Sequence, residues 1–181
     1  MILSIVAGTF IIPATAAVYL HELAVLPAFC IPAGVLWAIT LALFLKTKRS
    51  PIRLTTREGI LLVCFAWIGA GLLGAVPFML SGYVPHFSDA IFESVSGFTT
   101  TGASALENIE SYPMALRVWR TQMHWLGGMG IVALTVALFP LLGVGGFQLI
   151  KSETSGPDKG KVTAKITHTA KALWFIYLGM T

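Results

Sequence analysis

Three consecutive threonines and a glycine lie together in the run 98–104, which reads Phe-Thr-Thr-Thr-Gly-Ala-Ser. Threonine contributes a hydroxyl acceptor, and glycine allows a backbone turn that is closed to L-residues, so successive carbonyl oxygens can point at one axis. Rings of such carbonyls replace the hydration shell of a potassium ion in cation pores. The run therefore predicts a filter strand that binds a monovalent cation through its backbone.

A short helical pattern precedes this run, from Ser88 to Gly97, and Ser88 or Asp89 can cap it. About ten residues at a rise of 1.5 Å cannot cross a bilayer. Because spans flank the pattern on both sides, it fits a re-entrant helix that enters the membrane and returns. Its C-terminal end carries partial negative charge and points toward the threonine run, which favours a cation there.

The elements around this segment are apolar. Hydrophobic residues make up 56% of the 181 residues and charged residues 11%, against about a quarter charged in soluble domains. A spanning helix needs about 20 mostly apolar residues. Four such runs and the start of a fifth occur at 2–20, 23–45, 59–80, 121–150 and 172–181. The fourth exceeds one crossing, so we expect it to be tilted, or broken near Pro140 and the cluster of Gly143, Gly145 and Gly146.

Most lysines and arginines lie in two connectors, at residues 46–57 and 151–171. Two spans separate these connectors, so both can lie on the side that the positive-inside bias makes cytoplasmic. The amino terminus is then cytoplasmic too, while the His21-Glu22 turn and residues 82–112 face outward. Clusters of this kind are typical of membrane loops, so no nucleic-acid partner is expected.

The outward stretch carries four carboxylates and no lysine or arginine before Arg117. An anionic mouth raises the local concentration of cations, whereas the alternative is an ordinary solvated loop. Glu93 lies near membrane depth, where a carboxylate is a functional candidate; the alternative is a group in a solvated vestibule. If the stretch forms an anionic outer vestibule, Asp89 and Glu93 are its candidate residues.

Two further patterns concern packing. Trp119 and Trp125 suit an aromatic belt at the outer membrane interface. Gly69, Gly71 and Gly74 fit a dinucleotide-binding spacing, but they lie inside a span with no strand before them. Small residues at helical spacing instead let two helices approach closely. We expect the same of the glycines in residues 127–130.

Residues 92–103, Phe-Glu-Ser-Val-Ser-Gly-Phe-Thr-Thr-Thr-Gly-Ala, closely resemble the first pore loop of the Trk/Ktr/HKT potassium transporters. The resemblance is nearest to the TrkH branch and continues through residues 125–131, Trp-Leu-Gly-Gly-Met-Gly-Ile. It extends over 8–13, 142–149, 153–157 and 169–174, and so covers nearly the whole chain.

This resemblance implies a potassium uptake protein of the bacterial inner membrane, all-α and multi-pass, and not an enzyme. The family carries four span–pore–span repeats in one chain around one gated, channel-like pathway. Its TrkH branch has two extra leading helices, a cytoplasmic nucleotide-binding TrkA-type partner ring and, at full length, a homodimer. Potassium and membrane lipid are the implied ligands, with no covalently bound cofactor.

The family's organisation also implies boundaries. We expect two leading helices at 1–45, a basic cytoplasmic connector at 46–58 and the first repeat at 59–150, with its re-entrant loop at 86–104. A second cytoplasmic connector follows at 151–171, and the truncated opening of a second repeat lies at 172–181. On this pattern the sequence is an amino-terminal fragment that does not conduct by itself.

The ion-coordinating residues of the family carry over onto Thr100 and Thr101, which are the implied potassium ligands. Gly102 is the filter glycine, and Thr99 and Ala103 flank it. A single glycine here, in contrast to the Thr-Val-Gly-Tyr-Gly of potassium channels, leads us to hypothesise looser discrimination of potassium over sodium. A bi-ionic permeability ratio as steep as that of a potassium channel would refute this hypothesis.

Two rival functions remain open at this point. An intramembrane serine hydrolase could use Ser104 as nucleophile and His124 as base. Three threonines before the glycine argue against it, and a nucleophile needs no anionic mouth. A homotetrameric cation channel could take one filter from each of four chains, although the two leading helices argue against this arrangement.

Overall fold

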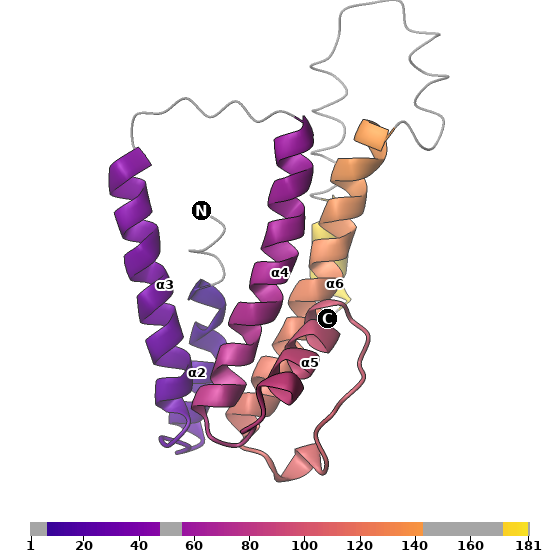
Figure 1. Cartoon of the computed structure of the whole chain (residues 1–181). Coiled ribbons are helices and arrows are strands. Elements are labelled where there is room, and N and C mark those ends of the chain that lie inside the picture. Colours follow the sequence, from indigo (N-terminus) through magenta and orange to yellow (C-terminus); the bar gives the residue numbers. More distant parts are fainter. Residues whose placement is uncertain (1–6, 48–55, 143–171, 181) are drawn as a thin grey trace, which may run out of the picture. The chain divides into compact units, whose positions relative to one another are not determined.

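The computed structural model describes residues 7–47, 56–142 and 172–180, and in these ranges the only regular structure is helical. The chain divides into two compact units, Met1–Trp125 and Leu126–Thr181. The labelled elements, in chain order, are α2 (Ile11–Tyr19), α3 (Leu26–Thr47), α4 (Thr56–Leu80), α5 (Phe87–Phe98), the 3-10 turn η1 (Ile109–Ser111) and α6 (Met114–Leu142) (Figure 1). The helical expectation is confirmed for these residues.

The helix boundaries follow the apolar runs closely. Two helices are long and apolar enough to cross a membrane, over Leu26–Lys46 of α3 and Arg57–Leu80 of α4. The short apolar helix Ala7–Tyr19 covers the described part of the first predicted span. A helix at residues 172–179 lies within the second unit, where a fifth run was expected. Residues 48–55 and 143–171, which hold most of both predicted basic connectors, lie outside the described residues.

The fourth predicted run differs most from the structure. α6 starts at Met114, before the expected Thr121, and continues past Pro140 to Leu142. A break at Pro140 was therefore a wrong prediction, and the glycines at 143–146 lie outside the described residues. The early start brings Arg117 and Arg120 into the first turns of α6, whereas the predicted span began only after these two charges.

α5 confirms the short helix but not its cap. His86 precedes the helix in an extended conformation, and no side chain caps the first turn. The Ser88 hydroxyl donates instead to Asp89 Oδ1 at 3.1 Å. Prediction of Ser88 or Asp89 as the cap was wrong, because both lie inside the first turn and not before it.

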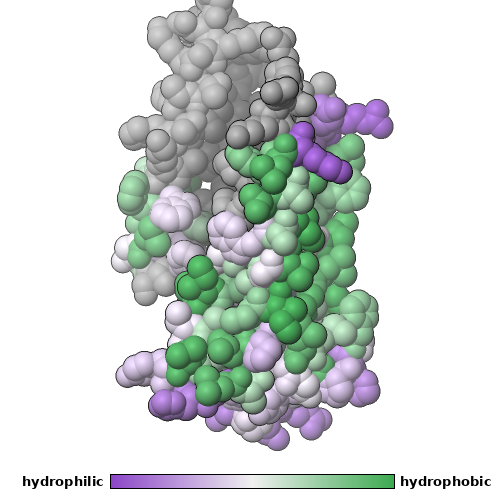
Figure 2. Space-filling model, turned by 90° about the vertical axis from the view of Figure 1, so that its left-hand side faces the viewer, coloured by the Kyte–Doolittle hydropathy of each residue, from purple (hydrophilic) through white to green (hydrophobic). Residues whose placement is uncertain are grey.

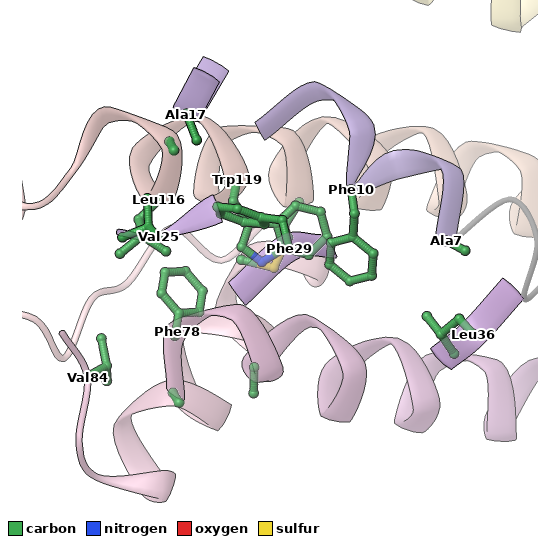
Figure 3. Close-up of a cluster of buried hydrophobic side chains, with 14 residues drawn as sticks. Ala7, Phe10, Ala17, Val25, Phe29, Leu36, Phe78, Val84, Leu116 and Trp119 are labelled. Atoms are coloured by element: carbon green, nitrogen blue, oxygen red, sulfur yellow. The ribbon is translucent and has the colours of Figure 1, made fainter. Parts of the chain in front are cut away.

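Trp119 is the centre of the buried core of the first unit (Figure 3). Its ring lies 4.7 Å from that of Phe10 and 6.4 Å from that of Phe29, centroid to centroid. Its indole Nε1 donates to the Gly74 carbonyl of α4 at 3.0 Å. The aromatic-belt prediction is therefore wrong for Trp119, which is 0% exposed. The ring joins the leading helices to α4 and α6.

Close approach explains three of the glycines. A Cβ at Gly71 would lie 3.1 Å from Val95 Cγ2, and a Cβ at Gly74 would overlap the Ser94 hydroxyl. In the second unit, a Cβ at Gly128 would lie 2.6 Å from the Tyr177 hydroxyl. The packing interpretation is confirmed at these positions, whereas a Cβ at Gly69 would meet nothing within 4 Å.

Large apolar side chains stay exposed along the helices of the first unit. Val35 is 52% exposed, Leu41 60% and Phe65 68%. Figure 2 shows hydrophobic residues over much of the length of one face, with hydrophilic residues gathered toward its ends. A soluble protein rarely leaves an apolar patch of this extent in water, so these faces are suited to lipid.

Candidate functional site

The chain leaves α5 through a Schellman turn. Thr99 is the C-cap, Thr100 N–H donates to the Gly97 carbonyl at 3.0 Å, and Thr101 N–H donates to the Ser96 carbonyl at 3.0 Å. Thr100 follows the cap with a φ of 57°, at the position where helices usually place glycine. A side chain in the left-handed region costs about 1–2 kcal/mol. Such strain at a β-branched residue is typical of functional segments.

Gly102 is the second left-handed residue, with a φ of 78°. Two left-handed residues separated by Thr101 prevent both helix and regular strand, so the backbone runs as an irregular segment over residues 99–104. The Thr99 hydroxyl donates to the Val95 carbonyl at 2.7 Å and lies 2.8 Å from the Thr101 hydroxyl. These contacts hold the start of the segment against the end of α5.

The carbonyl oxygens of the segment fall into two groups. The Gly102 carbonyl accepts from Arg120 Nη2 at 3.3 Å, and the Ala103 carbonyl accepts from Ser96 Oγ at 2.6 Å. Within the part of the chain that the structure describes, no group donates to the carbonyls of residues 99–101. Three successive backbone oxygens are therefore available to a ligand, while the next two are tied to neighbouring helices.

Glu93 of α5 is the centre of the contacts behind this segment. Its Oε1 accepts from Ser104 Oγ at 2.5 Å and from Ala105 N–H at 2.7 Å. Its Oε2 pairs with Arg120 Nε at 2.8 Å, and the Glu93 side chain is 0% exposed. Because Arg120 also donates to the Gly102 carbonyl, one buried carboxylate connects α5, the irregular segment and α6. We call this set of contacts the filter bracket; its members are Glu93, Gly102, Ser104, Ala105 and Arg120.

This arrangement corrects the vestibule prediction for Glu93. A carboxylate that is buried, paired with arginine and saturated with donors cannot line a water-filled mouth. Asp89 is part-buried, and its Oδ1 accepts from Ser88. A vestibule role for Asp89 stays a prediction.

Sequence reasoning missed Arg120, Ser96 and Ser104 as residues that hold the segment. The signal for Arg120 was present, because an ionisable residue at membrane depth is normally paired with another. Arg120 lies 27 positions beyond Glu93 on a different helix. No periodicity connects positions on separate helices, so the pairing could be named only as one candidate among several.

Ser104 and His124, the candidate pair of a serine hydrolase, each contact a different group. The Ser104 hydroxyl donates to Glu93, and His124 Nδ1 lies 2.9 Å from the Arg120 carbonyl of its own helix. Among the described residues no contact joins Ser104 to His124. A nucleophile needs a base within hydrogen-bond reach, so the structure does not favour the hydrolase.

Long apolar helices with exposed apolar faces, together with an irregular segment behind a short helix, are typical of a helical membrane protein. The TrkH family of cation transport proteins matches residues 27–181, which is most of the chain. The chain belongs to this family.

Relatives and a solved structure agree with this assignment. The Trk system potassium uptake protein TrkH of Halomonas elongata is 44% identical over 156 residues, covering 85% of this chain and 32% of that protein. TrkH of Escherichia coli K12 is 42% identical over 178 residues, covering 97% of this chain and 36% of that protein. These names describe transport proteins, in agreement with the expectation of a protein that is not an enzyme.

The crystal structure of the potassium transporter TrkH from Vibrio parahaemolyticus matches with a TM-score of 0.78 and 34% identity. The match covers 97% of this chain and 34% of that chain. This chain therefore spans about a third of the length of the relatives that it matches.

Proposed function

We propose that this chain supplies the first of four filter segments in a potassium uptake protein. In this proposal residues 59–150 form the first span–pore–span repeat, with α5 and residues 86–104 as its re-entrant loop. Potassium is the transported substrate and passes down its electrochemical gradient through a gated pathway. The single observation that carries the proposal is the run of successive carbonyls at residues 99–101, to which no group in the described ranges donates a hydrogen bond.

Three features support a cation at these carbonyls. α5 ends at the segment, so the partial negative charge of its C-terminus faces a ligand there. The left-handed conformations of Thr100 and Gly102 re-aim the backbone between them, as a filter of backbone oxygens requires. The Arg120 guanidinium is neutralised by Glu93, so a cation at the segment is not opposed by an unpaired positive charge.

The roles within the segment follow from these contacts. Thr100 and Thr101 coordinate the ion through their carbonyls, and the Thr99 carbonyl adds a third oxygen. Gly102 provides the turn that no side chain hinders. Ala103 anchors the segment through its bond to Ser96, which gives it a supporting role and not a coordinating one.

The wider assembly is part of the same proposal. The protein is a multi-pass protein of the bacterial inner membrane, with a cytoplasmic amino terminus, two leading helices within residues 1–45 and cytoplasmic connectors at 46–58 and 151–171. Residues 172–181 open the second repeat. A cytoplasmic nucleotide-binding TrkA-type ring regulates the pore, and two full-length chains form a homodimer.

Substitution of Gly102 by alanine in the complete protein tests the proposal. A Cβ at a left-handed residue costs about 1–2 kcal/mol, and here it distorts the pathway itself. We expect uptake of rubidium by a bacterium that lacks other potassium transporters to fall by about tenfold, at unchanged protein abundance.

Gly82→Ala is the matched control. Gly82 also has a positive φ, of 75°, and its Cβ would also meet nothing within 4 Å. It lies in the turn between α4 and α5, outside the segment. Gly82→Ala introduces a similar backbone strain outside the filter segment, so it should leave uptake unchanged. Equal losses of uptake in the two variants would refute the filter role of Gly102.

A further inference from the structure

The leading helices hold the start of α6 through a carboxylate. Glu22, in the turn between α2 and α3, accepts from Met114 N–H through Oε1 at 2.7 Å and from Ala115 N–H through Oε2 at 2.9 Å. These two amides belong to the first turn of α6, which has no acidic residue of its own. A carboxylate at a helix N-terminus satisfies free donors and complements the helix dipole. Glu22 is therefore the N-terminal cap of a helix that begins 92 positions later.

Two other contacts join the leading helices to the same part of α6. Gln122 Nε2 donates to the Thr9 carbonyl at 2.7 Å. Trp119 packs against Phe10 and Phe29 (Figure 3). The first three turns of α6 thus contact the leading pair at the cap, at the indole and at the amide.

Arg120 lies on this same stretch of α6, next to Trp119 and two residues before Gln122. Its guanidinium meets Glu93 and the Gly102 carbonyl. A shift of α6 along or about its axis would therefore move the guanidinium relative to the filter bracket. Because one rigid helix carries both sets of contacts, the leading pair fixes the position from which Arg120 reaches the segment.

We propose that Glu22 is a positioning residue for the filter: by capping α6 it sets the register of Arg120, and the leading helix pair thereby contributes to ion selectivity. This inference rests on the proposed function of residues 99–101. It assigns the leading pair a task beyond membrane anchoring. A cap that only stabilised the fold would change the amount of folded protein, whereas a positioning cap changes the choice of ion.

The experiment measures the sodium-to-potassium permeability ratio of the complete protein in lipid bilayers. Glu22→Gln keeps the side-chain shape but removes the charge that pairs with the helix end. We expect the ratio to change by about fivefold, the factor expected if the stabilisation that one helix cap typically supplies is expressed in full as a difference between the two ions. Glu110→Gln is the matched control, since Glu110 is an exposed carboxylate of the α5–α6 connection, and its ratio should stay at the unsubstituted value.

Arg120→Lys provides the second arm. It keeps the positive charge beside Glu93 but loses the planar geometry that reaches two acceptors. If Glu22 acts through Arg120, the two substitutions shift the ratio in the same direction and the double variant adds little to Arg120→Lys alone. Additive shifts would overturn the inference, as would a Glu22→Gln protein of normal selectivity and reduced abundance.

The two proposals fail in different ways. An unsubstituted protein that does not conduct potassium refutes the proposed function and this inference with it. An unsubstituted protein that selects potassium, whose ratio is insensitive to Glu22, refutes only the role of the cap.

Discussion

Glu93 is the single side chain whose environment explains most about the site. It has no solvent contact, yet its two oxygens receive donors from Ser104, Ala105 and Arg120. A buried carboxylate is costly unless it is both paired and hydrogen-bonded. The donors therefore act as a complete set, and two of them lie immediately after the segment that we propose as the filter. The carboxylate holds that segment in place without facing the ion.

Glu93→Gln tests this reading in the purified complete protein. It leaves the Arg120 charge without its partner; breaking a fully buried pair costs about 3–5 kcal/mol, and we expect less here because the Arg120 side chain is 21% exposed. We expect a clear drop in the melting temperature in detergent. Glu107→Gln is the control, because Glu107 is an exposed carboxylate in the connection between α5 and α6. It should change the free energy of unfolding by no more than about 0.5 kcal/mol. Similar melting temperatures in both variants would show that the bracket contributes nothing.

Residue types predicted an irregular, polar stretch at residues 99–104 better than they predicted the contacts that support it; the ion-ligand role of its carbonyls stays a prediction. The threonine–glycine run indicated an ion site because threonine adds a hydroxyl acceptor and glycine allows a turn that is closed to L-residues. The left-handed Thr100 was not foreseen, since a β-branched residue normally avoids that region. The bracket depends on residues of two helices and a loop, and no spacing in the sequence indicates which of them meet.

Among the elements, α4 and α5 show how a glycine determines packing. Gly74 of α4 leaves room for Ser94 and for Phe98, whose Cε2 would lie 2.6 Å from a Cβ there. Its carbonyl also accepts from Trp119. The short helix can therefore lie directly against α4.

Gly74→Ala should disturb this contact. Overpacking a tight interface costs about 1–3 kcal/mol, so we expect a lower melting temperature together with reduced rubidium uptake. Gly69→Ala, on the same helix but with open space around its Cβ, should be neutral or stabilising by up to about 1 kcal/mol. A tolerated Gly74→Ala would mean that α5 does not depend on this close approach.

The helices themselves could be predicted because apolar runs of membrane length have few alternatives. Their ends could not. α6 begins before its apolar run because Glu22 caps it from a distant turn, and α5 begins without any side-chain cap. The aromatic-belt rule failed for Trp119 for a related reason: its indole found an acceptor on a neighbouring helix instead of water.

At the scale of the first unit, three connections lie at the same end of the apolar helices. The α2–α3 turn, the α4–α5 connection and the start of α6 lie at one end of this unit (Figure 1). The bond from Met114 to Glu22 requires this placement. It agrees with the expectation that the His21-Glu22 turn and residues 82–112 share one side of the membrane. Which side that is stays a prediction.

Val35→Arg tests whether the exposed face of α3 lies in lipid. Val35 is near the middle of the span and 52% exposed, and an arginine at the centre of a membrane helix costs about 2.5–3.5 kcal/mol on insertion. We expect less of the protein to remain in the membrane after an alkaline wash. Leu23→Arg, at a residue 59% exposed in the α2–α3 turn, should insert normally. Equal insertion would place the middle of α3 in water.

The most direct measurement is a structure of the complete protein in thallium, a heavy mimic of potassium whose anomalous signal locates bound ions. The account predicts thallium on the pore axis within coordination distance of the carbonyls of residues 99–101, with the Ala103 carbonyl still bound to Ser96. Thallium elsewhere, with those three carbonyls facing protein or lipid, would contradict it.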